Sequence, residues 1–302
     1  MLIPATLTER CCEVLDRPHP ADLPTLKPRE RESHKGTYGR ALVIGGSLGM
    51  AGAVGLAGMA TIRAGAGLVR LGVPTSIVAT VASYEPAYMT APLTEDSEGR
   101  LAAAAADSIV ELATDVTALA VGPGLSRSGG LDALVARLFA DIRLPAVFDA
   151  DALNALAVDP KQLASHAGPR ILTPHPGEFQ RLLGGKKVDG RAAQEAAARE
   201  LAGRCQCIVV LKGHRTFVTD GRRDYTNTTG NPGMATGGTG DVLTGITTGL
   251  LCQGLAPLDA AQLAVYVHGL AGDLAAAELG EPSLSAVDVV RYLPPALRSV
   301  VA

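Results

Sequence analysis

The chain has 302 residues, of which 47% are hydrophobic, with 35 glycines, no tryptophan and a formal net charge of −3. This length can bury a full-sized core, and the composition disfavours intrinsic disorder. Because the chain has no excess of basic residues, nucleic acid is not expected as a partner. Five cysteines without a C-x-x-C pair argue against a disulfide framework.

Residues 1–35 are predicted to form an N-terminal arm, because Pro18, Pro20, Pro24 and Pro28 punctuate this stretch and residues 27–35 are heavily charged. The first ten residues lack the apolar core of a secretory signal. No stretch of the chain approaches the ~20 apolar residues that a membrane span needs. We therefore expect a cytoplasmic protein that does not engage a membrane.

Residues 36–302 are predicted to be a single α/β domain. Apolar runs at 41–45, 69–73, 118–122, 146–149, 170–173 and 208–211 indicate strands buried on both faces. Helical stretches follow at 52–66, 101–114, 131–140, 191–204, 241–253, 258–279 and 285–300. This alternation favours a mostly parallel sheet with helices on both faces. Residues 215–219 and 222–226 predict an edge hairpin, and Cys205 and Cys207 are expected to be buried strand residues.

The strongest motif is the glycine-rich stretch 227–241, NTTGNPGMATGGTGD, which leads into an apolar helical run. Such a loop presents free backbone N–H groups and the positive end of the helix dipole, where phosphate binds. Gly237, Gly238 and Gly240 leave room for phosphate against the backbone. Asp241 is expected at or next to the N-cap, either as a cap or as a base that deprotonates an alcohol during phosphoryl transfer. We favour the base, because a carboxylate beside an anion site makes electrostatic sense only if it serves a proton.

The stretch 173–179, TPHPGEF, directly follows a predicted strand. Its two prolines restrict the backbone and hold His175 at the carboxyl end of that strand. His175 is predicted to contact substrate. Glu178 either orients a metal-bound water or is a first-turn acid that favours the helix dipole. The alternative for the whole motif is a rigid turn that starts a helix.

Two other strand ends carry charged residues. Lys212, within VVLKGHRT, either reaches a nucleotide phosphate or extends to solvent. Asp149 and Asp151, within VFDADALN, suit Mg²⁺ or a ligand hydroxyl, or one of them caps the next helix. The glycine turns at 45–53 and 121–125 match neither G-x-G-x-x-G nor the P-loop, so both of those nucleotide sites are disfavoured.

In chain order, the segments GTYGRALVIGGS, GMAGA, VGPGL, VFDADALN, ILTPHPGEF, VVLKGHRT and NTTGNPGMATGGTGDVLTG resemble the ADP/ATP-dependent NAD(P)H-hydrate dehydratases of the ribokinase-like superfamily. The GGTGD block is shared with related small-molecule kinases, whereas TPHPGEF and DADALN narrow the resemblance to the dehydratases. The resemblance implies a ribokinase-like α/β fold. It also implies dehydration of the (S)-hydrate of NADH or NADPH, through phosphorylation of its 6-hydroxyl by ADP or ATP and elimination of phosphate.

The resemblance also implies roles for particular residues. Asp241 would be the catalytic base. The residues that would contact the hydrated nucleotide are Gly52, Ala53, Gly124, His175 and Asp241. Those that would line the ADP or ATP site are Lys212, Gly213, His214, Arg215, Thr216 and Gly240. Tetramers are common in the family, so a homo-oligomer is expected. Only about 35 residues precede the match, so the NAD(P)H-hydrate epimerase often fused to such enzymes is expected as a separate chain.

Two other functions stay open at the level of sequence. A kinase of a small alcohol, such as a thiazole or pyrimidine precursor, would use the same anion site and base but leave phosphate on its product. TPHPGEF and DADALN argue for the dehydratase instead. A nucleotide-binding regulator without catalysis would have no use for Asp241. The residues indicate neither a choice between ADP and ATP nor one between NADH hydrate and NADPH hydrate.

Overall fold

The computed structural model describes residues 8–16, 19–21 and 23–302. Within them, nine strands form one sheet in the order β3-β2-β1-β4-β5-β6-β7-β8-β9. Strands β1 to β7 pair in parallel, and β8 and β9 form an antiparallel edge hairpin. The strands are β1 (Arg40–Ile44), β2 (Leu68–Pro74), β3 (Met89–Leu93), β4 (Ala118–Val121), β5 (Ala146–Phe148), β6 (Arg170–Leu172), β7 (Ile208–Leu211), β8 (Phe217–Thr219) and β9 (Asp224–Thr226). The predicted mostly parallel sheet with an edge hairpin is confirmed.

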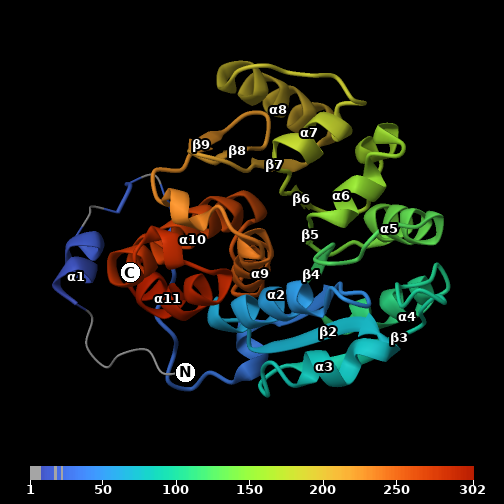
Figure 1. Cartoon of the computed structure of the whole chain (residues 1–302), viewed down its shortest axis with the longest axis horizontal. Helices are drawn as coiled ribbons and strands as arrows, with labels where there is room; N and C mark the ends of the chain where they lie inside the picture. The colour runs from blue at the N-terminus through green and yellow to red at the C-terminus, as the bar shows by residue number, and fades with distance from the viewer. Residues whose placement is uncertain (1–7, 17–18, 22) are drawn as a thin grey trace.

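Helices cover both faces of this sheet (Figure 1). One hydrophobic core contains side chains of α2 (Ala51–Arg63), α3 (Val78–Ala82), α9 (Thr239–Cys252), α10 (Pro257–Leu279) and α11 (Ala286–Arg298). A second core contains side chains of α4 (Ala105–Leu112), α5 (Gly129–Asp141), α6 (Asp151–Leu156), α7 (Pro176–Leu182) and α8 (Arg191–Cys205). The layers are therefore helix, sheet and helix, as the alternating pattern predicts.

Strand β1 shows why the strand segments are apolar throughout. Leu42 and Ile44 belong to one core, and Ala41 and Val43 belong to the other. Successive side chains of a strand point to opposite faces, so a central parallel strand covered by helices on both sides has no polar face. All four side chains are at most 1% exposed.

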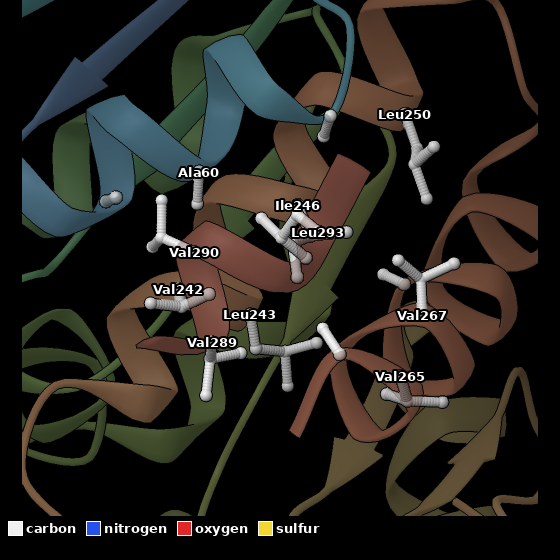
Figure 2. Close-up of a cluster of buried hydrophobic side chains, with 14 of the residues drawn as sticks. Ala60, Val242, Leu243, Ile246, Leu250, Val265, Val267, Val289, Val290 and Leu293 are labelled. Atoms are coloured by element: carbon white, nitrogen blue, oxygen red, sulfur yellow. The ribbon is translucent and has the colours of Figure 1, made fainter. Parts of the chain in front are cut away.

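Helix α9 is held unusually close to α2, and this contact fixes where α9 begins. Figure 2 shows the core around α9, including Ala60, Val242, Ile246 and Leu293. A Cβ on Gly245 would lie 2.2 Å from the Ala57 carbonyl oxygen, and one on Gly249 would lie 2.7 Å from that of Thr61. Only glycine allows such an approach. The two glycines thus place the N-terminus of α9 relative to the sheet.

Some local assignments from the sequence differ from the structure. Strand β3 is missed, because its five residues MTAPL include Pro92 and it is an edge strand with two exposed residues. The short helix α3 is missed as well, whereas α6 and α7 are expected only as alternatives, as the next helix after Asp149 and Asp151 and as a helix start within TPHPGEF. Cys205 and Cys207 are buried as expected, but the strand assignment is wrong. Cys205 ends α8, and Cys207 lies in the connection before β7.

The described part of residues 1–35 packs against the C-terminal helices. Helix α1 (Glu9–Leu15) lies against α10, where the buried thiol of Cys11 donates to the Leu274 carbonyl at 3.6 Å. Farther along, Leu26 forms a parallel bridge with Val301. Among the helices in the described ranges, none is long and apolar enough to cross a membrane.

Candidate active site

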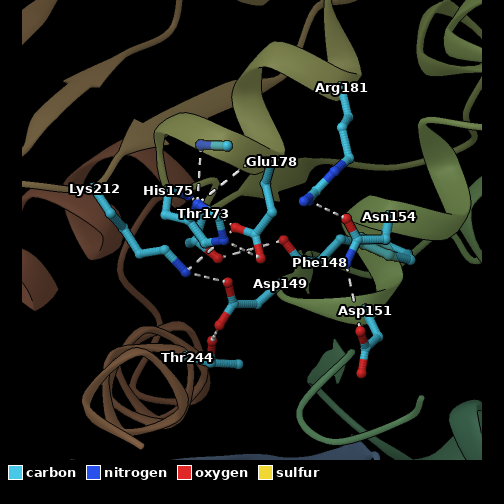
Figure 3. A network of polar contacts seen from close by, with 11 residues as sticks. Phe148, Asp149, Asp151, Asn154, Thr173, His175, Glu178, Arg181, Lys212 and Thr244 are labelled. Atoms are coloured by element: carbon cyan, nitrogen blue, oxygen red, sulfur yellow. Dashed lines mark hydrogen bonds and ion pairs between the residues drawn. The ribbon is translucent and has the colours of Figure 1, made fainter. Parts of the chain in front are cut away.

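The polar residues predicted for the site come together at the carboxyl edge of the sheet. Asp149 follows β5, Thr173 follows β6 and Lys212 follows β7, and the N-terminus of α9 lies at the same edge. Figure 3 shows the side chains of these strand ends converging on one polar network. Ligands of open parallel sheets bind at this edge, so the site lies where the fold favours one.

The glycine-rich loop ends in a helix N-terminus whose N-cap residue, a glycine, has no side chain to cap it. Gly238 is the N-cap residue and adopts a left-handed conformation with φ of 92°, which glycine tolerates best. The Thr239 hydroxyl is turned back to the carbonyls of Met234 and Thr236, at 3.0 Å each. The first N–H groups of a helix have no intrahelical acceptor, so this N-terminus is available to an anion.

Asp241 lies in the first turn of α9, at its third residue. The expectation that it lies at or next to the N-cap is wrong, because the left-handed Gly238 starts the helix earlier. Burial, together with the negative charge of Asp149, raises the pKa of Asp241 to about 7, and the ammonium of Lys212 opposes this rise. A carboxyl group with such a pKa can accept a proton near neutral pH.

The ammonium of Lys212 lies beside this helix N-terminus. Its ammonium donates to Asp149 Oδ1 at 2.6 Å and lies 3.8 Å from Glu178 Oε2. A Cβ on Gly240 would lie 3.4 Å from Lys212 Nζ, so the ammonium sits directly over the glycine loop. Burial opposes the charge on Lys212, but Asp149 and Glu178 outweigh it, and its pKa is raised. Lys212 is thus a fixed positive charge beside the anion site.

His175 and Glu178 form a reciprocal cap at the start of α7. His175 Nδ1 accepts the backbone N–H groups of Gly177 and Glu178, and Glu178 Oε2 accepts that of His175 at 2.8 Å. Burial lowers the pKa of His175 and raises that of Glu178 to about 7. Because Nδ1 accepts, the proton of the neutral ring is on Nε2, 3.3 Å from Glu178 Oε1. The helix-start interpretation of TPHPGEF therefore describes the local structure, and the two side chains also line the edge where ligands bind.

The glycine turns after β1 and β4 meet beside the start of α2. A Cβ on Gly124 would lie 3.0 Å from the Cβ of Ala53 and 2.7 Å from the Met50 carbonyl oxygen. The Ser47 hydroxyl donates to the Gly124 carbonyl at 2.9 Å. Gly52 faces open space and no side chain caps α2. The structure therefore brings Gly52, Ala53 and Gly124 together, as the resemblance implies.

The segment 213–216 follows Lys212 as a turn at the end of β7. The Lys212 N–H donates to the Pro174 carbonyl at 2.9 Å, which ties this turn to the TPHPGEF loop. Arg215 has a φ of 56°, and the Thr216 hydroxyl closes the turn onto the Gly213 carbonyl at 3.0 Å. Gly213 and His214 are exposed. The turn thus presents backbone groups next to the Lys212 ammonium.

Two residues that the sequence analysis misses complete the site. Thr244, on the second turn of α9, donates to Asp149 Oδ2 at 2.7 Å. Asp273 of α10 accepts from Gly230 N–H and from the amide of Asn231, and so ties the glycine-rich stretch to α10. Thr244 lies in an apolar helical run and Asp273 lies far along the chain, so no motif around either residue indicates a place in the site.

The alternative that Asp149 or Asp151 caps the next helix is wrong, because the N-cap residue of α6 is Ala150 and neither carboxylate caps it. Both oxygens of Asp149 accept hydrogen bonds within the protein, from Lys212 and from Thr244. Asp151 instead accepts the backbone N–H of Ser126 at 2.8 Å and so braces the VGPGL turn. In the described ranges, no group of three or more His, Cys, Asp or Glu side chains is arranged to hold a metal ion.

A cavity lies apart from this network. It has a volume of about 630 Å³ and is lined by residues of α7, α8 and the segment 159–164. None of the predicted site residues lines it. The site is therefore defined by its convergent charges and by the open helix N-terminus.

Comparison with known proteins gives the family of this chain. The sequence model of the NAD(P)H-hydrate dehydratase family matches residues 41–295. The bifunctional NAD(P)H-hydrate repair enzyme Nnr of Moorella thermoacetica is 46% identical over 277 residues, which cover 91% of this chain and 52% of that protein. The ADP-dependent (S)-NAD(P)H-hydrate dehydratase of Bacillus subtilis is 38% identical over 272 residues, covering 89% of this chain and 93% of that protein.

Solved structures of similar proteins have the same fold as this chain. The ADP/ATP-dependent NAD(P)H-hydrate dehydratase of Bacillus subtilis, co-crystallized with ATP and Mg²⁺, superposes with a TM-score of 0.75 at 31% identity and covers 92% of this chain and 99% of that one. A hydroxyethylthiazole kinase of Pyrococcus horikoshii, at 15% identity and a TM-score of 0.58, shares the fold alone and covers 85% of this chain and 88% of that one. The fold is ribokinase-like, and the chain belongs to the NAD(P)H-hydrate dehydratase family.

Proposed function

We propose that this protein dehydrates the (S)-hydrate of NADH or NADPH back to the reduced nucleotide, with ADP or ATP as the phosphoryl donor. The observation that carries the proposal is Asp241, a carboxyl group with a pKa of about 7 inside an uncapped helix N-terminus. The chain spans about half the length of the bifunctional relatives it matches, and nearly the whole of the Bacillus subtilis dehydratase. We therefore propose for this chain the dehydratase activity that the Bacillus subtilis protein is named for.

The chemistry follows from the poor leaving ability of hydroxide. Asp241 takes the proton of the 6-hydroxyl while that oxygen attacks the terminal phosphorus of the donor, releasing AMP from ADP or ADP from ATP. Phosphate then leaves C6 with the C–O bonding electrons as C5 loses a proton, and the C5–C6 double bond of the nicotinamide is restored. A positioned base accelerates such a step by ~10²–10⁴-fold. The N–H groups of α9 and the ammonium of Lys212 stabilise the charge on the transferring group.

The nucleotide donor is proposed to lie along the glycine loop and the end of β7. Gly237, Gly238 and Gly240 would let its phosphates approach the N-terminus of α9. The turn 213–216 would receive the rest of the donor beside Lys212. The exposed backbone of this turn and the ammonium over Gly240 support this placement.

Mg²⁺ is proposed to accompany the nucleotide phosphates, as the Bacillus subtilis structure was obtained with ATP and Mg²⁺. The residues do not fit an ion bound directly by Asp149, whose two oxygens are both engaged within the protein. Glu178 is another buried carboxylate at this edge, and we propose that it orients a water of the nucleotide-bound ion. Mg²⁺ would supply neutralisation of phosphate charge.

The hydrated nicotinamide is proposed to lie against Gly52, Ala53, Gly124 and His175, opposite the donor. This placement is supported by the open space at Gly52 and by the contact between Gly124 and Ala53. We also propose a cytoplasmic homo-oligomer, such as a tetramer. A NAD(P)H-hydrate epimerase, which interconverts the two hydrate epimers, would be its functional partner.

The test is to mix the purified protein with NADH hydrate, Mg²⁺ and ADP, and to follow absorbance at the reduced nicotinamide band. We expect a nucleotide-dependent rise matched by one free phosphate per NADH. A parallel reaction with ATP identifies the preferred donor. Flat absorbance with both donors, or phosphate that stays on an organic product, would overturn the proposal in favour of a kinase of another alcohol.

A further inference from the structure

Asp149 is the most enclosed charged group at the carboxyl edge of the sheet. It is 1% exposed, and each of its oxygens has a different partner. Oδ1 accepts from the ammonium of Lys212 at 2.6 Å, and Oδ2 accepts from the hydroxyl of Thr244 at 2.7 Å. A carboxylate bound from both sides in this way is fixed in position and has little capacity left for a ligand.

The two partners of Asp149 lie on different parts of the fold. Lys212 follows β7, and Thr244 lies on α9, three residues beyond Asp241. Residues that are three apart on a helix lie on the same side, so Thr244 and Asp241 face the same edge. Asp149 therefore connects the cation after β7 to the helix that carries the base (Figure 3).

We propose that Asp149 and Thr244 are positioning residues that hold the Lys212 ammonium over Gly240, where it meets the phosphoryl group in transfer. In this arrangement the ammonium is the resident cation between Asp149 and Glu178. The inference rests on the proposed function, because it assigns Lys212 its role in that reaction.

The geometry favours this role over direct binding of a metal by Asp149. The Lys212 ammonium is 2.6 Å from Asp149 and 3.8 Å from Glu178, and so lies in the space between the two carboxylates. A divalent ion bound there by Asp149 would have to displace the ammonium and meet it at close range. A Cβ on Gly240 would lie 3.4 Å from Nζ and 3.9 Å from Asp149 Oδ2. Glycine at this position therefore leaves space above the loop for the pair and for a phosphate.

The first experiment replaces Thr244 by valine, which keeps the shape and removes the hydroxyl. The matched control is Thr248→Val, because Thr248 is equally buried on the same helix and its hydroxyl donates only to a carbonyl of that helix. We expect kcat to fall about tenfold in Thr244→Val, with KM for the hydrate unchanged, and to stay within about twofold in Thr248→Val. Thr244→Ser, which keeps the hydroxyl, should restore kcat.

A double-mutant cycle then tests whether Asp149 acts through Lys212. We expect Asp149→Asn and Lys212→Met each to lower kcat at least about tenfold, and the double variant to be no slower than Lys212→Met alone. If the fold losses of kcat in the two single variants multiply in the double variant, Asp149 acts independently of Lys212, and the inference is overturned. Equal losses in Thr244→Val and Thr248→Val, or no rescue by serine, would do the same.

Two measurements do not depend on turnover. Electron paramagnetic resonance of the wild type with Mn²⁺ alone and no nucleotide should detect no bound ion that depends on Asp149. The same measurement on Asp149→Asn should therefore show no loss of bound ion. A bound ion that is lost in this variant would overturn the inference. Acylation followed by mass spectrometry should modify Lys212 far more slowly than the exposed Lys187 in the wild type, and this protection should be lost in Asp149→Asn. Equal protection in both proteins would likewise overturn it. If the wild type shows no dehydratase activity while protection by Asp149 is found, the proposed function fails and the tethering of Lys212 stands.

Discussion

Two buried cations lie at opposite edges of the same sheet and are stabilised in opposite ways. Arg170, the first residue of β6, is fully buried, and its guanidinium donates to the backbone carbonyls of Phe139, Ile142, Leu144 and Pro169. These carbonyls include the end of α5, where the helix dipole favours a positive charge. Among the described residues no carboxylate pairs with Arg170. Burial lowers its pKa to about 10, so it stays charged at neutral pH.

Lys212, at the carboxyl edge, is paired with carboxylates and stays 18% exposed. Its neighbours Glu178 and Asp241 have pKa values raised to about 7 by burial. Backbone carbonyls cannot change their charge, so Arg170 is purely a structural cation. Carboxylates can gain or lose a proton, so the charge around Lys212 responds to protons and to ligands. The partners of a buried charge, more than its burial, therefore separate a structural role from a chemical one.

The largest effect is expected for Asp241→Asn, which removes the base and keeps the shape of the side chain. We expect kcat to fall by at least ~10²-fold while nucleotide binding is retained. The unfolding free energy should stay the same or rise by about 1–2 kcal/mol, because a buried carboxylate that burial destabilises is removed. Turnover assays and thermal denaturation measure the two effects. Near-normal turnover would remove Asp241 from the mechanism.

The pH dependence is the next largest effect. Asp241 must be unprotonated to act as the base, so kcat should rise about tenfold per pH unit up to about pH 7 and then level off. Stability should change in the opposite direction. The folded state holds protons on Asp241 and Glu178 that the unfolded chain releases at lower pH, so this contribution to stability falls as pH rises from about 4 to about 7.

Rate and denaturant-unfolding measurements across pH 5 to 8 test both signs. In Asp241→Asn the part of the stability change that comes from this residue should disappear. A pH–rate profile that is flat below pH 7 would contradict the assignment of the base.

Charge-conserving exchanges at the two cations test the comparison directly. Arg170→Lys keeps the charge but cannot reach all four carbonyls, and should lower the unfolding free energy by about 2 kcal/mol while kcat stays within about twofold. Lys212→Arg should lower kcat about tenfold, because the larger guanidinium does not fit over Gly240, with a smaller loss of stability. If both exchanges lowered stability and neither lowered kcat, Lys212 would be a structural cation as well.

The smallest effect on stability is expected for Gly237→Ala. A Cβ there would meet nothing within 4 Å, and its φ is not positive. The unfolding free energy should therefore change by less than about 0.5 kcal/mol. KM for the nucleotide should rise, because the new methyl group would occupy the space proposed for phosphate. Gly238→Ala is the contrasting variant, since its φ is 92° and its Cβ would lie 2.6 Å from Leu56. An unchanged KM in Gly237→Ala would place the phosphates elsewhere on the loop.

Much of the molecule could be predicted from the sequence, because the information is local. Apolar runs predict the central strands, and glycine spacing before an apolar helix predicts the anion site around Gly240. The prolines around His175 predict its position at a strand end. These features depend on backbone sterics and on the periodicity of side chains, which neighbouring residues in the chain determine.

Only the tertiary structure decided which of the candidate charges work together. The role of Asp149 stays open in the sequence, because a metal, a substrate hydroxyl and a helix cap all suit a carboxylate at a strand end. Its partners Lys212 and Thr244 lie 63 and 95 residues away in the chain. Arg170 likewise shows no sign in the sequence that backbone carbonyls surround it. The energy of a buried charge depends on groups brought close by folding, and distances of a few ångströms between remote residues cannot be derived from local patterns.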